Sequence, residues 1–121
     1  MLVATSNKTK QLLVLTYVGR VRLEELVSQR AEIKTLATEL SSGLRVVADF
    51  THLEVMDRDC ISELGLMMET IDHIGVGTVV RVIPDASKDV GLNILTHFHY
   101  RKHPHVVTCK SLKEGLQALE I

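Results

Sequence analysis

The sequence predicts a single α/β domain, with a mixed, mainly parallel sheet of four to five strands and about four helices. Stretches rich in β-branched residues alternate along the chain with stretches of helical periodicity. A helix between two strands returns the chain in its original direction, so this alternation favours parallel strands. The 121 residues have the length of one domain with one hydrophobic core, and no repeat or linker divides them. We therefore expect one domain over residues 1–121.

Two strands and a helix are predicted in the first part of the chain. Residues 2–4 form a short apolar strand, and residues 12–21 form a stronger one in which Gly19 marks a bend or bulge. A turn at residues 6–9 lets these strands pair as a hairpin. Residues 22–42 carry one apolar helical stripe. The stripe consists of Leu23, Leu26, Val27, Ile33, Leu36, Ala37 and Leu40.

Residues 43–75 are the segment around which the rest of the chain is organised. Gly43 is placed to cap the preceding helix, and a buried strand follows it and ends at Asp49 and Phe50. A polar connection through Thr51 and His52 then leads to the next helix. We expect the function to lie in this strand, loop and helix.

The helix of this segment opens at residues 57–59. Asp57 or Asp59 is suited to accept backbone N–H groups at the helix start, and Gly75 is suited to end the helix in a left-handed conformation. Apolar residues lie nearly all round this helix, so a second apolar face favours packing under another helix or a homodimer contact. These residues are Ile61, Leu64, Leu66, Met67, Met68, Ile71 and Ile74.

The last part of the chain continues the alternation. A β-branched run predicts a strand over residues 78–83, and a helix capped by Ser87 follows it up to residue 101. Residues 105–109 form the last strand. Ser111 and Glu114 have the spacing of a capping box, which opens a short final helix.

Composition excludes several classes of function. A formal net charge of −1, with two Phe, two Tyr and no Trp, offers neither the charge nor the stacking surface that nucleic acid needs. Two isolated cysteines, the lack of a signal peptide and the lack of an apolar run of about 20 residues predict a cytoplasmic protein without membrane insertion. No glycine-rich phosphate loop or nucleophile elbow is present, so we expect no cofactor and no enzyme.

Three stretches, taken in order, resemble a STAS domain, the fold of bacterial anti-sigma factor antagonists and of sulfate-transporter tails. Residues 14–21 resemble the strand that ends in a glycine turn before the first helix. Residues 46–65 resemble the central strand, its hydrophobic loop, a Met-Asp pair and the following helix. Residues 106–119 resemble the closing strand and its Ser-initiated helix. The resemblance implies a STAS-like fold and a non-catalytic regulatory module that binds a protein partner.

The sequence departs from the family at its regulatory position. Antagonists of this kind carry a serine pair after the Met-Asp, which a partner kinase phosphorylates, and here Arg58 and Asp59 occupy those positions. Ser62 lies one turn further into the helix and is a poor substitute. The resemblance therefore implies a partner surface around residues 49–62 that is not switched by serine phosphorylation.

The residues predicted to contact the partner are His52, Asp57, Arg58, Asp59 and Ser62. Asp49 and Glu54 add to the acidic neighbourhood at the end of a parallel strand, the edge of such sheets where ligands bind. The alternative interpretation is that the carboxylates only cap the helix and solvate a loop. Asp57→Ala or Arg58→Ala should weaken partner binding without unfolding the domain.

A second hypothesis is a small metal-binding or enzymatic protein that uses four histidines within residues 97–105. Imidazole is a good ligand for zinc, nickel or copper, and His99 and His103 have the i, i+4 spacing of a helical site. His97 and His99 point in different directions on a helix, and exposed histidines at a helix end are the competing interpretation. His105 completes the set. A reactive Cys60, activated by the helix dipole, is a further alternative.

Overall fold

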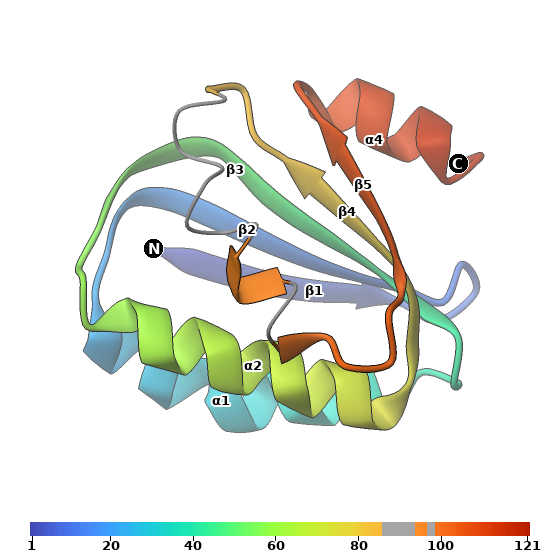
Figure 1. Cartoon of the computed structure of the whole chain (residues 1–121), viewed down its shortest axis with the longest axis horizontal. Coiled ribbons are helices and arrows are strands. Elements are labelled where there is room, and N and C mark those ends of the chain that lie inside the picture. Colours follow the sequence, from blue (N-terminus) through green and yellow to red (C-terminus); the bar gives the residue numbers. More distant parts are fainter. Residues whose placement is uncertain (86–93, 97–98) are drawn as a thin grey trace.

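In a computed structural model of the chain, five strands form one sheet in the order β1-β2-β3-β4-β5 (Figure 1). The structure describes residues 1–85, 94–96 and 99–121. The strands are β1 (Leu2–Asn7), β2 (Leu12–Val21), β3 (Leu44–Met56), β4 (Val76–Val82) and β5 (His105–Cys109). β1 is antiparallel to β2, and each later strand is parallel to the one before it. The predicted α/β class, the hairpin and the mainly parallel sheet are confirmed.

The helices divide between the two faces of the sheet. α1 (Leu23–Thr38) and α2 (Cys60–Ile74) lie side by side on one face, and α4 (Leu112–Ala118) packs on the other face near β5 (Figure 1). Residues 94–96 are also helical. Most of the helix predicted to follow Ser87 lies outside the described residues.

The core follows the alternation of side chains along the strands. In β2, Leu13, Leu15 and Tyr17 belong to the large cluster under α1 and α2, whereas Leu12 faces the small cluster under α4. The ring of Tyr17 stacks on that of Phe50 with 4.6 Å between centroids. Two layers of helix on one sheet thus bury both of its faces.

The predicted helix over residues 22–42 is too long at its C-terminal end. α1 ends at Thr38, and Gly43 does not cap it. Gly43 instead occupies a turn with φ of +88° and donates its N–H to the carbonyl oxygen of Gly75 at 2.6 Å. Val27, which the sequence placed in the apolar stripe, has 46% of its surface exposed.

The predicted end of the third strand is wrong in a way that matters for the site. β3 does not stop at Asp49 and Phe50 but continues through the expected polar connection to Met56. β4 pairs with β3 only as far as Asp49, whereas β2 pairs with it up to Val21 and Met56, with two register shifts. The extra residues remain a strand because β2 accepts and donates their hydrogen bonds. We call residues 51–56 the β3 extension.

Two predicted helix ends are confirmed. Gly75 follows α2 with φ of +108° and donates to the carbonyl oxygen of Ile71, as a left-handed cap does. Ser111 Oγ accepts the N–H of Glu114 at 3.2 Å at the start of α4. The Glu114 carboxylate accepts the N–H of Lys110, one residue before the cap, rather than that of Ser111.

Candidate partner-binding site

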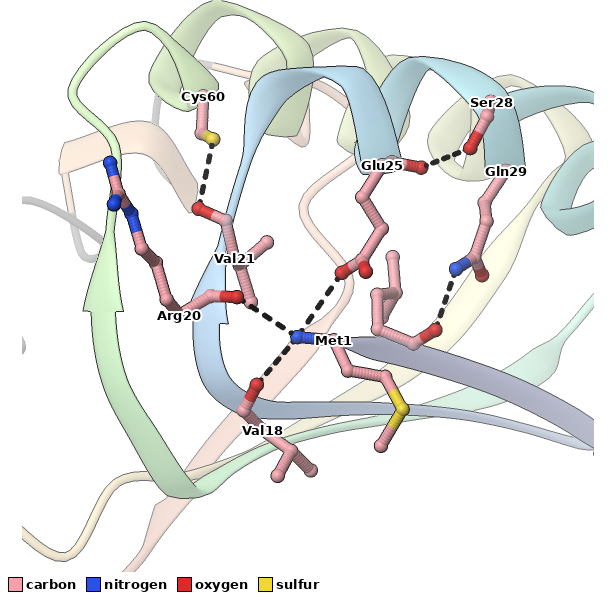
Figure 2. A network of polar contacts seen from close by, with 9 residues as sticks. Met1, Val18, Arg20, Val21, Glu25, Ser28, Gln29 and Cys60 are labelled. Carbon is pink, nitrogen blue, oxygen red and sulfur yellow. Dashed lines mark hydrogen bonds and ion pairs between the residues drawn. The ribbon is translucent and has the colours of Figure 1, made fainter.

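The ends of β2 and the β3 extension meet the start of α2 at one edge of the molecule. The N–H of Asp57 donates to the carbonyl oxygen of Val21 at 3.1 Å, which ties the turn after β3 to the end of β2. Figure 2 shows the Cys60 thiol, in the first turn of α2, donating to the same carbonyl oxygen at 3.7 Å. One backbone oxygen therefore fixes how the helix leaves the sheet.

Strand β1 is held at the same end of β2. The amino nitrogen of Met1 donates to the carbonyl oxygens of Val18 at 2.6 Å and Arg20 at 3.1 Å, and it lies 3.2 Å from a carboxylate oxygen of Glu25 (Figure 2). These contacts join β1, β2 and α1 beside the candidate site.

The predicted capping role of Asp57 and Asp59 is wrong. The Asp57 carboxylate pairs with the Arg20 guanidinium, with both Nε and Nη2 at 3.1 Å from Oδ1. Asp59 is the N-cap residue, but it has helical φ and ψ and its side chain accepts no capping hydrogen bond. An N-cap side chain reaches the helix N–H groups from an extended backbone, so this geometry leaves the Asp59 carboxylate at the surface.

The predicted contact residues lie on three consecutive elements: a strand, a turn and a helix. Arg58, Asp59 and Ser62 are exposed together at the start of α2, and Asp57 is half-buried beside them. His52 is exposed on the β3 extension, about 16 Å from Asp57 at the usual rise of an extended strand. The strand thus separates His52 from the other four residues, which the predicted loop would have kept together.

Two hollows flank the β3 extension. One of about 490 Å³ lies toward β2 and is lined by Val18, Gly19 and residues 51–54. The other, of about 390 Å³, lies toward β4 and is lined mainly by apolar side chains. Its lining residues are Phe50, Thr51, Leu53, Glu54, Val55, Met56, Ile83, Pro84 and Asp85. The extension is therefore a ridge between two concave surfaces.

Exposed apolar side chains accompany the charges at this edge. Val55, near the end of β3, has 52% of its surface exposed, and Ile61, in the first turn of α2, has 49%. Between them in the chain lie the exposed charges of Arg58 and Asp59. A partner could bury these two apolar side chains and contact the charges between them.

Cys60 lacks the lowered pKa and the exposure of a reactive thiol. Burial raises its pKa, and the negative charges of Asp59 and Asp57 raise it further. The lower pKa expected from the helix dipole is therefore wrong, because desolvation and two carboxylates outweigh the dipole. Cys60 is a buried packing residue.

The histidines near residue 100 do not gather into a metal site in the described residues. His99 Nδ1 lies 2.8 Å from a carboxylate oxygen of Glu69, and the ring covers Gly65 on α2. His103 has a left-handed backbone with φ of +52°, and His105 begins β5. No group of three or more ligating side chains is close enough to hold a metal in the part of the chain described, and His97 lies outside it.

Two buried carboxylates were not predicted from the sequence. Glu63 on α2 is paired with the Arg30 guanidinium on α1 by two hydrogen bonds of 2.5 and 2.6 Å, which raise the pKa of Arg30. Asp72 accepts the backbone N–H groups of Arg101 and Lys102. A signal existed for Glu63, because helical spacing puts it on the same face as buried residues three before and four after it.

Little space remains between the sheet and the helices for a ligand. The cavity there measures about 30 Å³ and is lined mostly by apolar side chains, with Arg81 and Thr96 among its polar residues. That volume holds about one or two water molecules. The larger hollows lined by described residues lie outside the core.

The sheet order, the helices on its faces and the strand, turn and helix at residues 51–62 define a STAS-like fold. No protein-family model and no curated protein matches the sequence. Among the helices described, none is long and apolar enough to cross a membrane.

Solved structures match almost the whole chain at low sequence identity. The anti-sigma factor antagonist SpoIIAA in its unphosphorylated form is 13% identical over 99% of this chain and 98% of its own, with a TM-score of 0.69. The Bacillus cell fate determinant SpoIIAA in its phosphorylated form is 12% identical over 98% and 99%, with a TM-score of 0.67. A DUF3478 protein with a SpoIIAA-like fold from Shewanella loihica PV-4 is 11% identical over 98% and 92%, with a TM-score of 0.71.

Proposed function

We propose that this protein is a non-catalytic regulatory module that binds a cytoplasmic protein partner through the β3 extension and the start of α2. The contact residues are His52, Asp57, Arg58, Asp59 and Ser62. The observation that carries the proposal is the exposed edge at residues 55–62. There the charged side chains of Arg58 and Asp59, which cap no helix, lie in the chain between the exposed Val55 and Ile61. The STAS-like fold shared with anti-sigma factor antagonists supports a regulatory role.

Serine phosphorylation does not control this surface in our proposal. Phosphate on a helix-start hydroxyl changes a surface by adding charge where the helix dipole favours it. At this helix start, Arg58 and Asp59 already present one permanent charge of each sign. Ser62 has an exposed hydroxyl in the first turn, so phosphate found on Ser62 of protein purified from its natural cells would overturn this part of the proposal.

The test compares the partner proteins that bind immobilised wild type with those that bind the immobilised Arg58→Glu variant. The matched control is Lys113→Glu, which makes the same charge change on an exposed residue of α4. A partner retained by the wild type and the control but lost by Arg58→Glu supports the proposal. If every partner binds all three proteins equally, the surface is not where we place it.

Self-association is part of the same proposal. Leu66 is about half exposed on α2, for which the sequence predicted a second apolar face. A second copy of the chain is the occupant we expect there. Native mass spectrometry gives the oligomeric state, and a dimer that persists unchanged in Leu66→Lys would exclude this face as the contact.

A further inference from the structure

The far end of α2 from the candidate site carries a cluster of basic side chains. His73 is exposed in the last turn of α2, and Arg101, Lys102 and His103 are exposed in the turn that precedes β5. We call these four residues the basic corner. Lys102 Nζ donates to the carbonyl oxygen of His73 at 3.3 Å, which joins its two parts. His73 lies thirteen residues after Cys60 on α2, which puts this corner about 20 Å from Cys60.

A buried carboxylate holds the backbone of the basic corner in place. Asp72 is 7% exposed, and its two oxygens accept the N–H groups of Arg101 at 3.2 Å and Lys102 at 3.3 Å. His103 follows with a left-handed backbone, which few non-glycine residues adopt. The turn is thus fixed by a buried group and carries local strain, which stays only where the surrounding structure maintains it.

The two carboxylates next to the basic corner already have hydrogen-bonding partners. Both oxygens of Asp72 accept backbone N–H groups, and Glu69 contacts His99. No ion pair joins the side chain of Arg101 or Lys102 to a carboxylate within the described residues. Two permanent cations therefore face solvent, beside a hollow of about 350 Å³. The hollow is lined by Glu69, Asp72, His73, His99, Arg101 and Lys102.

We propose that the basic corner binds an acidic peptide segment of a protein partner, with an Asp or Glu side chain of that segment between Arg101 and Lys102. This surface lies at the opposite end of α2 from residues 52–62 and does not depend on the function proposed for them. The exposed cations of Arg101 and Lys102 are complementary in charge to a carboxylate, and the hollow beside them has room for one such side chain.

Other anionic partners fit the basic corner less well. A membrane surface attracts clusters of four to eight Lys or Arg, or a smaller cluster next to an exposed apolar side chain. The basic corner has only two such cations, and none of its four residues is a large apolar one. A free phosphate binds best to unused backbone N–H groups, and Asp72 occupies those of Arg101 and Lys102. Nucleic acid requires more positive charge than a chain of net charge −1 provides.

The test measures the fluorescence anisotropy of a fluorescein-labelled oligoglutamate at low salt, with labelled oligoglutamine as the neutral probe. The chain as a whole is slightly negative, so overall charge does not attract oligoglutamate. Three proteins are compared: the wild type, R101E/K102E, and the control K110E/K113E, whose exposed lysines lie at the other end of β5 and on α4. The charge change is the same in both variants.

We expect the wild type and K110E/K113E to bind oligoglutamate with similar affinity, and R101E/K102E to bind it at least about tenfold more weakly. Added salt should weaken all of this binding, and oligoglutamine should not bind. No binding by the wild type, or equal loss in both variants, would overturn the proposal.

Two further variants keep the test decisive. If R101E/K102E is unfolded by circular dichroism, R101Q/K102Q replaces it, with an expected loss of about two- to fivefold for each cation removed. Arg58→Glu should bind oligoglutamate as the wild type does. A loss in Arg58→Glu would place the acidic-peptide site at the other end of α2 and contradict this inference without affecting the proposed function.

Discussion

Helix α2 begins at Cys60 without a side-chain cap and ends in a dense set of polar contacts. At its first turn, Asp59 accepts no capping bond, and Arg58 and Ile61 are exposed. At its last turn, Gly75 caps the helix and the buried Asp72 holds the turn before β5. The first turn is held on its buried side by Cys60 and Glu63, so only its exposed side chains are available to a partner.

The removal of Asp72 should have the largest effect on stability. In Asp72→Ala, the backbone N–H groups of Arg101 and Lys102 lose their acceptor, which should lower the free energy of unfolding by about 2–3 kcal/mol. Asp72→Asn keeps one acceptor and should fall between this variant and the wild type. Urea denaturation measures both values. A loss in Asp72→Ala as small as that of an ordinary surface substitution would show that the last turn of α2 is not anchored by this residue.

A glycine in the middle of α2 allows the next contact to form. A Cβ atom on Gly65 would lie 2.6 Å from Nε2 of His99, so Gly65→Ala should displace the imidazole and lower the free energy of unfolding by about 1–2 kcal/mol. Helix propensity alone predicts the opposite sign, a gain of about 1 kcal/mol. The sign of the measured change therefore distinguishes a steric conflict with His99 from the effect of helix propensity.

A double-mutant cycle sharpens this prediction. In a His99→Ala background the obstacle is absent, and Gly65→Ala should become stabilising because alanine is the better helix former. If Gly65→Ala costs the same with and without the imidazole, the conflict lies elsewhere in α2. Urea denaturation of the four proteins completes the cycle.

The thiol at the start of α2 tests how well that end is packed. Burial and the neighbouring Asp59 and Asp57 raise the pKa of Cys60, so less thiolate is present at any given pH than in the unfolded chain. At pH 8 the native protein should react with iodoacetamide far more slowly than the protein in urea, as followed by intact mass. Modification of Cys60 at equal rates in both states would show that the first turn of α2 opens to solvent.

Sequence patterns reproduced those parts of the fold that depend on neighbouring residues. β5 has its predicted bounds, and the Ser111 cap and the left-handed Gly75 are where the sequence placed them. The β3 extension was missed because its existence depends on the length of β2, a partner more than thirty residues away in the chain. Local polarity around Thr51 and His52 indicated a loop, and strand pairing overrode it.

The candidate site shows the same limit. The sequence located the strand, turn and helix, and it found the exposed Arg58 and Asp59. It did not foresee that Asp57 would pair with Arg20, a residue 37 positions earlier, because charge pairing across a fold leaves no periodic signal. Asp72 escaped for a related reason, since its partners are backbone N–H groups of residues about thirty positions later.

The smallest effect on stability is expected for the substitution of Asp59. The comparison is Ser111, which caps the start of α4. Asp59→Ala should change the free energy of unfolding by about 0.5 kcal/mol or less, since only a weak interaction with the helix dipole is lost. Ser111→Ala, which removes the hydroxyl that accepts the N–H of Glu114, should cost about 1 kcal/mol. A cost for Asp59→Ala that equals or exceeds that of Ser111→Ala would mean that Asp59 does cap α2 in solution. In that case its carboxylate would be committed to the helix, and Arg58 and Ser62 would remain as the contacts at this end of α2.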